Sequence, residues 1–425
     1  MHAKHLGILL MVMLMALLLH GCASLPPVRT ENPMEEDLYV LATNLPDVHA
    51  DFFHDGTRKE LRKLYDQVAR EIGSLDDTDF YFALSKITAF AHDSHTAVGI
   101  TPELAAHFHV IPMNLSFIDG AWRILAIDAD RRNLLGAQVL AVGGMPMERI
   151  IGLARVLVGH DNEVWLYHSV ARFLHLSEFY SYLGASEDPL ANISFTVVPY
   201  GSTEPVAVKF VPRSSATISA MQFATLYDVV PPTGISTLPY RYLTLDSHDA
   251  LFIQYNVCAS VPGYPLSDFI DEVLATIRRD APKRVIVDLR YNGGGDSRLF
   301  EPMVDGLARL QQEMGFPLDV LIGEGTFSSA VMNAIHFTRR TACRLVGSPT
   351  GGSVNHYGEV ASFELPNSKL PVMYSTRHFV MDPSHAPGPL IPHVSAGKSV
   401  ADLLAGKDTV IGHILGATTE ISGTP

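Results

Sequence analysis

Apolar and polar positions alternate with a helical period in the first part of the chain. Apolar residues recur at spacings of three and four in two stripes, formed by Leu38, Leu41 and Leu45 and then by Leu61, Leu64, Val68 and Ile72. Each stripe would occupy one face of an amphipathic helix. The acidic run Asp76–Asp79 is typical of a further helix start. The pattern predicts a small helical domain over residues 36–100.

After residue 100 the pattern changes to short β-rich runs separated by turns such as Asp119-Gly120 and Gly143-Gly144. Four runs are typical of strands: 111–117, 122–128, 138–142 and 193–198. We expect a β-rich domain over residues 101–212, interrupted by a helical insert over about 147–183. A linker over residues 213–238 is expected to follow it.

From residue 239 onward, apolar runs and helical stretches take turns. The run Arg284–Leu289 shows no polar alternation, which indicates a strand buried on both faces. The predicted order is strand 251–255, helix 266–278, strand 284–289, helix 297–312, strand 318–323, helix 329–340 and strand 344–347. Strands joined through helices predict βαβ units and a mostly parallel sheet. Residues 239–425 therefore belong to the α/β class.

The start of the chain indicates export. A short basic stretch precedes an unbroken apolar run, Leu6–Leu19, which is typical of a signal peptide and short for a membrane span. The small Gly21 before Cys22 resembles the lipidation box of bacterial lipoproteins. We expect a lipoprotein signal over residues 1–21, a lipid on Cys22 and a tether over residues 22–35, with an ordinary cleaved signal peptide as the alternative. The lipid would anchor the mature chain in the cell envelope, at the outer membrane or in the periplasm of a two-membrane cell.

Composition narrows the class of protein. An apolar fraction of 47% excludes a disordered chain, and a net charge of −14 argues against nucleic acid as the main partner. Of three cysteines, Cys258 and Cys343 lie beyond the leader, which leaves one disulfide or two buried thiols open. The oligomeric state is not indicated.

A glycine triplet follows the strand predicted at 284–289. The sequence reads Asp288-Leu289-Arg290-Tyr291-Asn292-Gly293-Gly294-Gly295-Asp296, and a helix is predicted just after it. Glycines at such a turn let backbone N–H groups converge on an anion or on a developing oxyanion. The spacing fits neither a dinucleotide-binding fingerprint nor a P-loop, so no such cofactor is expected. A glycine-rich turn without function is the alternative.

Ser328 falls where a predicted strand ends and an apolar helix begins. A nucleophile there is exposed at the carboxyl edge of the sheet, beside N–H groups that lack intrahelical acceptors. Serine is also a favoured helix N-cap, so a capping role is the alternative.

Two histidines end the predicted helical domain, in His92-Asp93-Ser94-His95-Thr96. A histidine far from a serine in sequence can still be its base, because catalytic triads are assembled in space. A surface histidine or half of a metal site are the alternatives. The Glu of a zinc-binding His-Glu-x-x-His motif is absent, so no metal is expected.

Together these segments resemble the carboxyl-terminal-processing and tricorn-type serine peptidases, peptidase family S41. The resemblance is carried by Asp288-Leu289-Arg290-x-Asn292-x-Gly294-Gly295, Thr326-x-Ser328, Val346-Gly347-x-x-Thr350-Gly351-Gly352, Asp93-Ser94-His95-Thr96 and a closing segment from Pro392 to Leu415. It covers most of residues 36–425. It implies an S41-type core with a crotonase/ClpP-like spiral over residues 239–425 and a PDZ-like module over residues 101–212.

The resemblance also implies catalytic roles. Ser328 matches the family's nucleophile. The processing branch has a lysine base 25 residues after the serine, where this chain has Ser353. The tricorn-like branch uses a histidine preceded by a serine, which Ser94-His95 matches. We therefore expect His95 as general base and Ser94 as the residue that orients it, with Asp93 as the alternative.

Backbone N–H groups of Ser329 and of a glycine, Gly294 or a neighbour, would form the oxyanion hole. Tricorn-like enzymes also carry a glutamate in the closing segment, and residues 382–393 contain none. Asp382 is a candidate substitute.

The sequence thus predicts an envelope-anchored serine peptidase with a peptide or protein substrate and no cofactor. The alternative is a non-catalytic S41-like binding protein for an apolar ligand or a peptide, since one fold hosts both. The substrate itself is not indicated.

Overall fold

The computed structural model describes residues 31–227 and 231–416, so the predicted signal peptide and Cys22 lie outside the described residues. The chain divides into two compact units, each assembled from separate stretches of sequence. The first unit contains the chain up to His107, Val156–Gly159 and Tyr357–Arg377. The second contains Phe108–Arg155, His160–His356 and the chain from His378.

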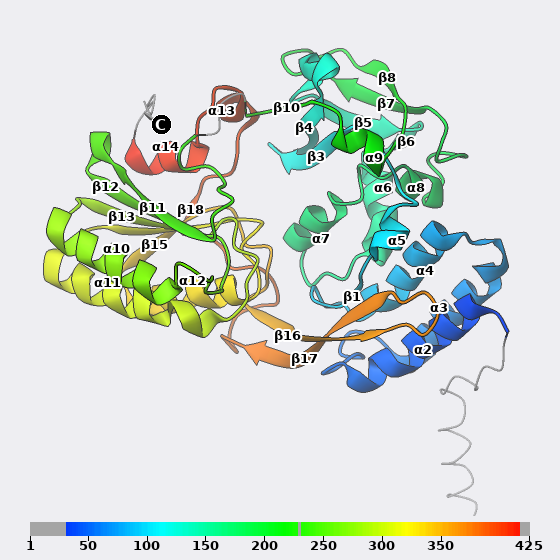
Figure 1. The fold of residues 1–425 in the computed structure, drawn as a ribbon, viewed down its shortest axis with the longest axis horizontal. Coiled ribbons are helices and arrows are strands. Elements are labelled where there is room, and N and C mark those ends of the chain that lie inside the picture. Colours follow the sequence, from blue (N-terminus) through cyan, green and yellow to red (C-terminus); the bar gives the residue numbers. More distant parts are fainter. Residues whose placement is uncertain (1–30, 228–230, 417–425) are drawn as a thin grey trace, which may run out of the picture. The chain divides into compact units, whose positions relative to one another are not determined.

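Helices form most of the first unit (Figure 1): α2 (Pro33–Val48), α3 (Arg58–Glu71), α4 (Asp77–Ala89) and the short α5 (Pro102–Ala105). The predicted start of α4 is confirmed, because the Asp76 side chain accepts hydrogen bonds from the N–H groups of Thr78 and Asp79. The predicted stripe on α2 is confirmed as well, since Leu38 and Leu41 are fully buried. Burial of a leucine contributes about 1.5–3 kcal/mol, so this face holds α2 in place.

A three-stranded sheet completes the first unit, with the order β1 (Ala97–Val98), β17 (Pro371–Val380) and β16 (Asn355–Glu364). β1 pairs antiparallel with β17, with Ala97 opposite Met373. This pairing joins the segment after α4 to a hairpin much later in the chain.

The second unit contains a seven-stranded sheet, with antiparallel pairing throughout. Its strands are β3 (Met113–Ile118), β4 (Ala121–Asp128), β5 (Gln138–Val142), β6 (Met145–Pro146), β7 (Ile193–Val198), β8 (Val206–Phe210) and β10 (Phe223–Thr225). The four predicted strands correspond to β3, β4, β5 and β7, and the predicted helical insert contains α6 (Met147–Ala154), α7 (Glu163–Val170) and α8 (Ser177–Tyr182). β10 lies within residues 213–238, where a linker is predicted, and it pairs with β4. A three-residue strand carries too little pattern to be recognised in the sequence.

The second unit also contains a six-stranded sheet. Its order is β11 (Tyr240–Leu245), β12 (Ala250–Tyr255), β13 (Arg284–Asp288), β14 (Leu318–Ile322), β15 (Cys343–Gly347) and β18 (Val394–Ser395). Only the β11–β12 pair is antiparallel. The predicted parallel sheet with βαβ units is therefore confirmed.

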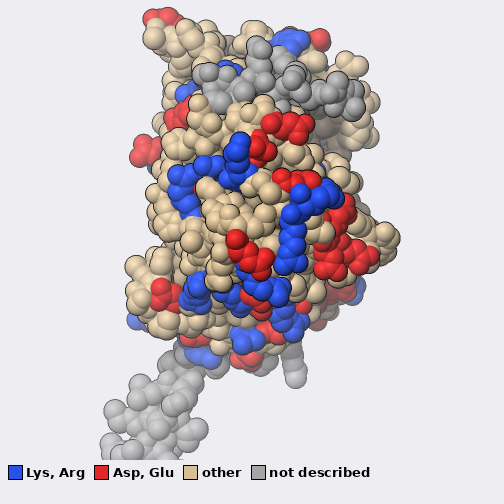
Figure 2. Space-filling view, turned by 90° about the vertical axis from the view of Figure 1, so that its left-hand side faces the viewer, with Lys and Arg blue, Asp and Glu red and all other residues tan. Residues whose placement is uncertain are grey.

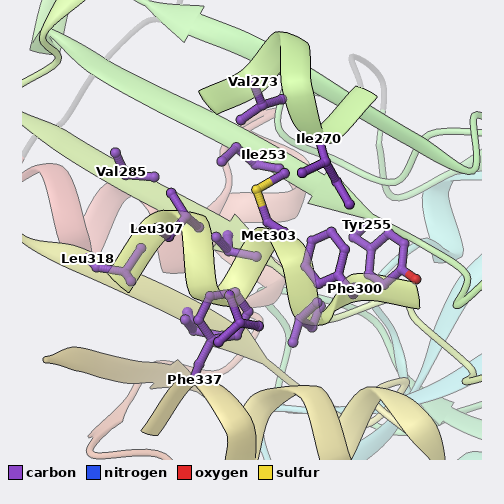
Figure 3. Close-up of a cluster of buried hydrophobic side chains, with 14 of the residues drawn as sticks. Ile253, Tyr255, Ile270, Val273, Val285, Phe300, Met303, Leu307, Leu318 and Phe337 are labelled. Carbon is purple, nitrogen blue, oxygen red and sulfur yellow. The ribbon is translucent and has the colours of Figure 1, made fainter. Parts of the chain in front are cut away.

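Helices cover both faces of this sheet (Figure 1). One face packs against α10 (Leu266–Asp280), α11 (Glu301–Met314) and α12 (Ser329–Arg340), and the other against α14 (Thr409–Leu415). Val285 and Val287 of β13 face the first group, and Ile286 faces α14. The predicted burial of this strand on both faces is therefore confirmed. In the hydrophobic core between the sheet and helices α10, α11 and α12, the rings of Tyr255 and Phe300 stack with their centroids 3.8 Å apart (Figure 3).

Both described cysteines are free thiols, Cys258 buried and Cys343 half-buried. Burial raises the pKa of Cys258 to about 12, so this thiol is unreactive at neutral pH. Within residues 31–227 and 231–416, no helix combines the length and the apolar character that crossing a membrane requires. The face in Figure 2 carries basic and acidic side chains interspersed with one another.

Candidate active site

Ser328 lies between β14 and α12, at the first turn of the helix. Its backbone is strained, with φ 51° and ψ −125°, a region that side-chain-bearing residues rarely occupy. Such a conformation costs about 1–3 kcal/mol and persists only where the surroundings impose it. The Ser328 side chain makes no capping hydrogen bond to α12. The capping alternative therefore does not describe this serine.

Two glycine loops close around Ser328. A Cβ atom added to Gly294 would lie 2.7 Å from Ser328 Cβ, and one added to Gly352 would lie 3.0 Å from Ser328 N. Gly294 has φ +107°, which also favours glycine. The two loops can approach the serine this closely only because both positions lack a side chain.

Hydrogen bonds attach these loops to the segment that carries Ser328. Phe327 N–H donates to Asn292 O (3.0 Å), Ser329 Oγ donates to Gly295 O (2.6 Å) and Gly352 N–H donates to Thr326 O (3.0 Å). The Thr326 hydroxyl in turn donates to Leu289 O (2.8 Å), at the end of β13. The strained turn is thus held by both neighbouring loops.

Backbone donors gather beside the serine. Ser329 is the first residue of α12, so its N–H belongs to the group without an intrahelical acceptor. A Cβ on Gly294 would lie 3.2 Å from Ser329 N, so the glycine and this amide adjoin. The Gly294 N–H donates to Asn292 Oδ1 (2.9 Å), and Gly293 and Gly295 on either side are exposed. The Ser329 N–H can stabilise negative charge on an oxygen next to Ser328, whereas the Gly294 N–H, predicted as the second donor, is bound to Asn292.

Helix α7 supports the segment around Ser328 through an aromatic stack. The ring centroids of Trp165 and Phe327 are 3.7 Å apart, and the two ring planes are nearly parallel, with an angle of 12° between them. Asn162, which caps α7, donates to Gly351 O (2.8 Å) and to Ser353 Oγ (2.9 Å). Helix α7 and its cap therefore contact both the segment that carries Ser328 and the glycine loop packed against it.

A buried ion cluster fixes Arg290, which lies just before the glycine loop of residues 293–295. Arg290 donates two hydrogen bonds of 2.9 Å to the carboxylate of Asp288 and two of 2.9 Å to that of Asp408. Burial would raise the pKa of Asp408, but the charge of Arg290 lowers it. Because Asp408 also caps α14, the closing segment is fixed to the end of β13.

A groove of about 940 Å³ lies between β3 and α7 and reaches the β14 loop. It is lined by Asn114–Gly120 of the β3 hairpin, by side chains of α7 and by the Glu324–Lys398 ion pair. Burial would raise the pKa of Glu324, but the charge of Lys398 brings it to about 2. Burial, with Arg172 nearby, lowers the pKa of His168 to about 4, so this groove histidine is neutral at pH 7.

The predicted base belongs to the first unit. The side chain of His95 is 7% exposed, and its Nδ1 lies 3.7 Å from Oδ1 of Asp93. This distance is within ion-pair range and longer than a hydrogen bond. Burial would raise the pKa of Asp93, but the hydrogen bond from His49 and the nearby His95 ring hold it well below its usual value. The neighbouring Ser94 is buried.

The structure brings Gly294, Ser328 and Ser329 together in the second unit, and Ser94 with His95 in the first. Ser353, at the position of the processing-branch lysine, accepts from Asn162. Asp382 engages its own turn, since Oδ1 accepts from the N–H and the hydroxyl of Ser384. Across the described residues, no group of three side chains is placed to hold a metal ion.

Comparisons with known proteins place this geometry in a known fold. No family model matches the chain, and no curated protein matches its sequence. Mature CPAF complexed with lactacystin is similar in structure, with a TM-score of 0.60 and 14% identity over 90% of this chain and 97% of that one. The fold is that of S41 serine peptidases.

Two further solved structures are similar to this chain. A CPAF mutant with serine replaced by alanine matches with a TM-score of 0.59 and 13% identity, over 92% of this chain and 99% of that chain. A photosystem II D1 C-terminal processing protease matches with a TM-score of 0.45 and 12% identity, over 91% and 98%. At these identities the likeness concerns the S41 fold, and residue roles rest on the geometry of this chain.

Several residues that contact the Ser328 segment or Asp93 carry no signal in the sequence. Trp165 and Asn162 lie in a helical insert, and their partners are far along the chain. His49 follows α2, and its Nε2 lies 3.2 Å from Oδ2 of Asp93. Asp408 starts a short helix near the end of the described chain. Each of these contacts joins positions that are distant along the chain, so it depends on tertiary structure.

Proposed function

We propose that this chain is a serine peptidase in which Ser328 is the nucleophile and His95 the general base. The observation that carries the proposal is the strained conformation of Ser328 at the start of α12, with Gly294 and the Ser329 amide packed against it. A serine that only capped the helix would have no need of this strain. Peptide substrates follow from the fold shared with S41 serine peptidases.

The reaction follows from these roles. Ser328 Oγ attacks a peptide carbonyl carbon while His95 accepts the hydroxyl proton. The Ser329 N–H and a glycine N–H of the 293–295 loop bind the oxyanion. His95 then protonates the leaving amine, and water hydrolyses the acyl-enzyme by the same steps. Catalysis requires His95 and Ser328 Oγ within about 2.6–3.2 Å in the substrate complex.

A fluorophosphonate probe tests the assignment directly. The probe reacts with activated serines, so we expect mass spectrometry to find the adduct on Ser328. Labelling should be lost in Ser328→Ala and fall by at least about 1,000-fold in His95→Ala. Ser384→Ala is the matched control, because this serine is exposed and lies in a turn, and it should label normally. A folded wild-type chain that never reacts would reject the proposal.

A second candidate function is ligand binding without turnover, and the groove between β3 and α7 favours it. Its volume of about 940 Å³ suits an apolar ligand or an extended peptide. This function predicts that an apolar fluorescent dye binds equally well to Ser328→Ala and His95→Ala. Tyr167→Asp, which puts a charge on the groove wall, should weaken the dye's binding. Dye binding without probe labelling would favour this second function.

We also propose that Cys22 is lipidated and that the mature chain is anchored in the cell envelope. The proposal is supported by the leader sequence alone. Expression in a bacterial host fed with an alkyne-tagged fatty acid should label the wild-type chain and leave Cys22→Ala unlabelled. Equal labelling of the two chains would contradict the proposal.

A further inference from the structure

Asp93 is the centre of a hydrogen-bond network within the first unit. Its side chain is fully buried and lies between α4 and β1. Oδ2 accepts from His49 Nε2 (3.2 Å), Thr96 Oγ1 (2.6 Å) and Ser375 Oγ (2.6 Å). Oδ1 accepts from the His95 N–H (2.9 Å) and faces the His95 ring. A buried carboxylate with this many donors is held in one position.

The tautomer of His49 follows from the hydrogen bond that its Nδ1 accepts. His49 Nδ1 accepts a hydrogen bond from the Asp51 N–H (3.0 Å), so this nitrogen carries no proton. The ring proton of His49 therefore sits on Nε2 and is donated to Asp93. The ring is buried and packs near Phe52 and Tyr357, which fixes its plane. His49 thus acts as a neutral donor to the carboxylate.

The charge of Asp93 is not balanced by these contacts. The donors on Thr96 and Ser375 are hydroxyls, and that on His49 is a neutral ring. No lysine or arginine pairs with Asp93 in the part of the chain that the structure describes. Tyr357 also faces the cluster, and burial, with the charges of Asp51 and Asp93, raises its pKa. His95 is the group that can balance the carboxylate by accepting a proton.

We propose that Asp93 is the positioning carboxylate of His95, and that His49 holds Asp93 in place for this task. The inference rests on the proposed function of His95 as general base. It removes the need for a glutamate in the closing segment, because the acid comes from the residue two positions before the base. It also replaces Ser94, the predicted orienting residue, with Asp93.

The proton path is then defined. His95 Nδ1 faces Asp93, so the proton of Ser328 Oγ moves to Nε2 as the serine attacks. The imidazolium that forms is stabilised by the carboxylate, which stays ionised and takes no proton. When the leaving amine departs, Nε2 returns the proton to it. The 3.7 Å separation of Nδ1 from Oδ1 shortens to a hydrogen bond in the substrate complex.

Protonation of His95 is the first readout, since it does not depend on activity. The Cε1–H signal of His95, assigned by comparison with His95→Gln, is followed by NMR against pH in the full chain. In Asp93→Asn the midpoint of this curve should fall by about one pH unit or more, because an adjacent carboxylate favours the charged ring. Ser375→Ala removes a donor and keeps the charge, so its midpoint should stay near that of the wild type.

The second readout is the rate of Ser328 labelling as a function of pH. The acidic limb of this profile should shift in Asp93→Asn together with the NMR midpoint. His49→Leu should slow labelling by about tenfold, and His49→Gln should recover most of that loss because its amide can still donate to Asp93. A role of His49 in packing alone would give no recovery.

The outcomes separate this inference from the proposed function. Wild-type labelling with an unchanged His95 midpoint in Asp93→Asn overturns the inference and leaves the peptidase standing. A wild-type chain that never labels rejects the peptidase, and with it the catalytic role of Asp93. If Asp93→Asn does not fold, the His49 pair decides, since equal labelling by His49→Leu and wild type also overturns the inference.

Discussion

The two parts of the proposed catalytic machinery are built by opposite means. Around Ser328 the second unit supplies backbone: glycines, amide groups and a strained serine. Around His95 the first unit supplies side chains that converge on one buried carboxylate, Asp93. The backbone site is defined by contact distances, so an added atom should break it. The side-chain site is defined by charge and donors, so it should respond to pH and tolerate isosteres that keep both.

The largest effect is expected at the glycine loop. Gly294→Ala places a Cβ about 2.7 Å from Ser328 Cβ at a backbone angle that alanine rarely adopts. We expect the rate of Ser328 labelling to fall by about 1,000-fold, comparable to the loss of oxyanion stabilisation. Gly293→Ala is the matched control, because nothing lies within 4 Å of its added Cβ. Similar rates for the two variants would show that contact distances do not define this site.

The next largest effect is expected at the ion cluster of Arg290, Asp288 and Asp408. Asp408→Ala leaves Arg290 with only one of its two carboxylates, in a buried setting. Removing one partner of a buried ion pair costs about 3–5 kcal/mol, and urea denaturation should show a loss of about 3 kcal/mol in the free energy of unfolding. Asp271→Ala on the exposed face of α10 should change it by less than about 0.5 kcal/mol. A loss that small in Asp408→Ala would mean that the closing segment is not anchored here.

The aromatic stack should have a smaller effect. Trp165→Leu removes the parallel contact with Phe327, which precedes the proposed nucleophile Ser328. Such contacts contribute about 0.5–1.5 kcal/mol, so labelling of Ser328 should slow by up to about tenfold. Trp165→Phe keeps a stacked ring and should stay within about twofold of the wild type. Equal rates for the Leu and Phe variants would show that α7 does not position the serine.

The smallest effect concerns acid stability at the groove. Because the pKa of Glu324 is lowered to about 2, its pair with Lys398 stabilises the fold above pH ~4.5 and this contribution disappears as the pH falls toward 2. The Glu324 side chain is 36% exposed, so solvent screening keeps the contribution below about 1 kcal/mol. Denaturation at pH 7 and pH 3 should show a slightly steeper acid loss in the wild type than in Glu324→Gln. An identical pH dependence would mean that the pair contributes nothing.

The sequence predicts those parts of the fold whose causes are local. Three such patterns predict their elements directly: the spacing of three and four on α2, the acidic cap at Asp76 and the unbroken apolar run of β13. The position of Ser328 can be predicted for the same reason, because a strand, a turn and an apolar helix follow one another there in one short stretch. The glycine triplet is equally local.

What the sequence does not predict depends on partners that are distant along the chain. His49 reaches Asp93 and Trp165 reaches Phe327 only after the chain has folded. The short strand β10 is defined by its pairing with β4, not by its own pattern. Asp408 has the composition of an ordinary helix cap, and its ion pair with Arg290 follows from tertiary structure.

The interleaving of the two units limits how the protein can be divided. Each unit is made of stretches that alternate along the chain, so no single cut yields two complete units. The helices before His107, expressed alone, would lack β17, the strand on which β1 pairs. A gene fragment therefore cannot carry the serine half or the histidine half as an independent module. Recombination, truncation and domain fusion should accordingly preserve both halves or lose both.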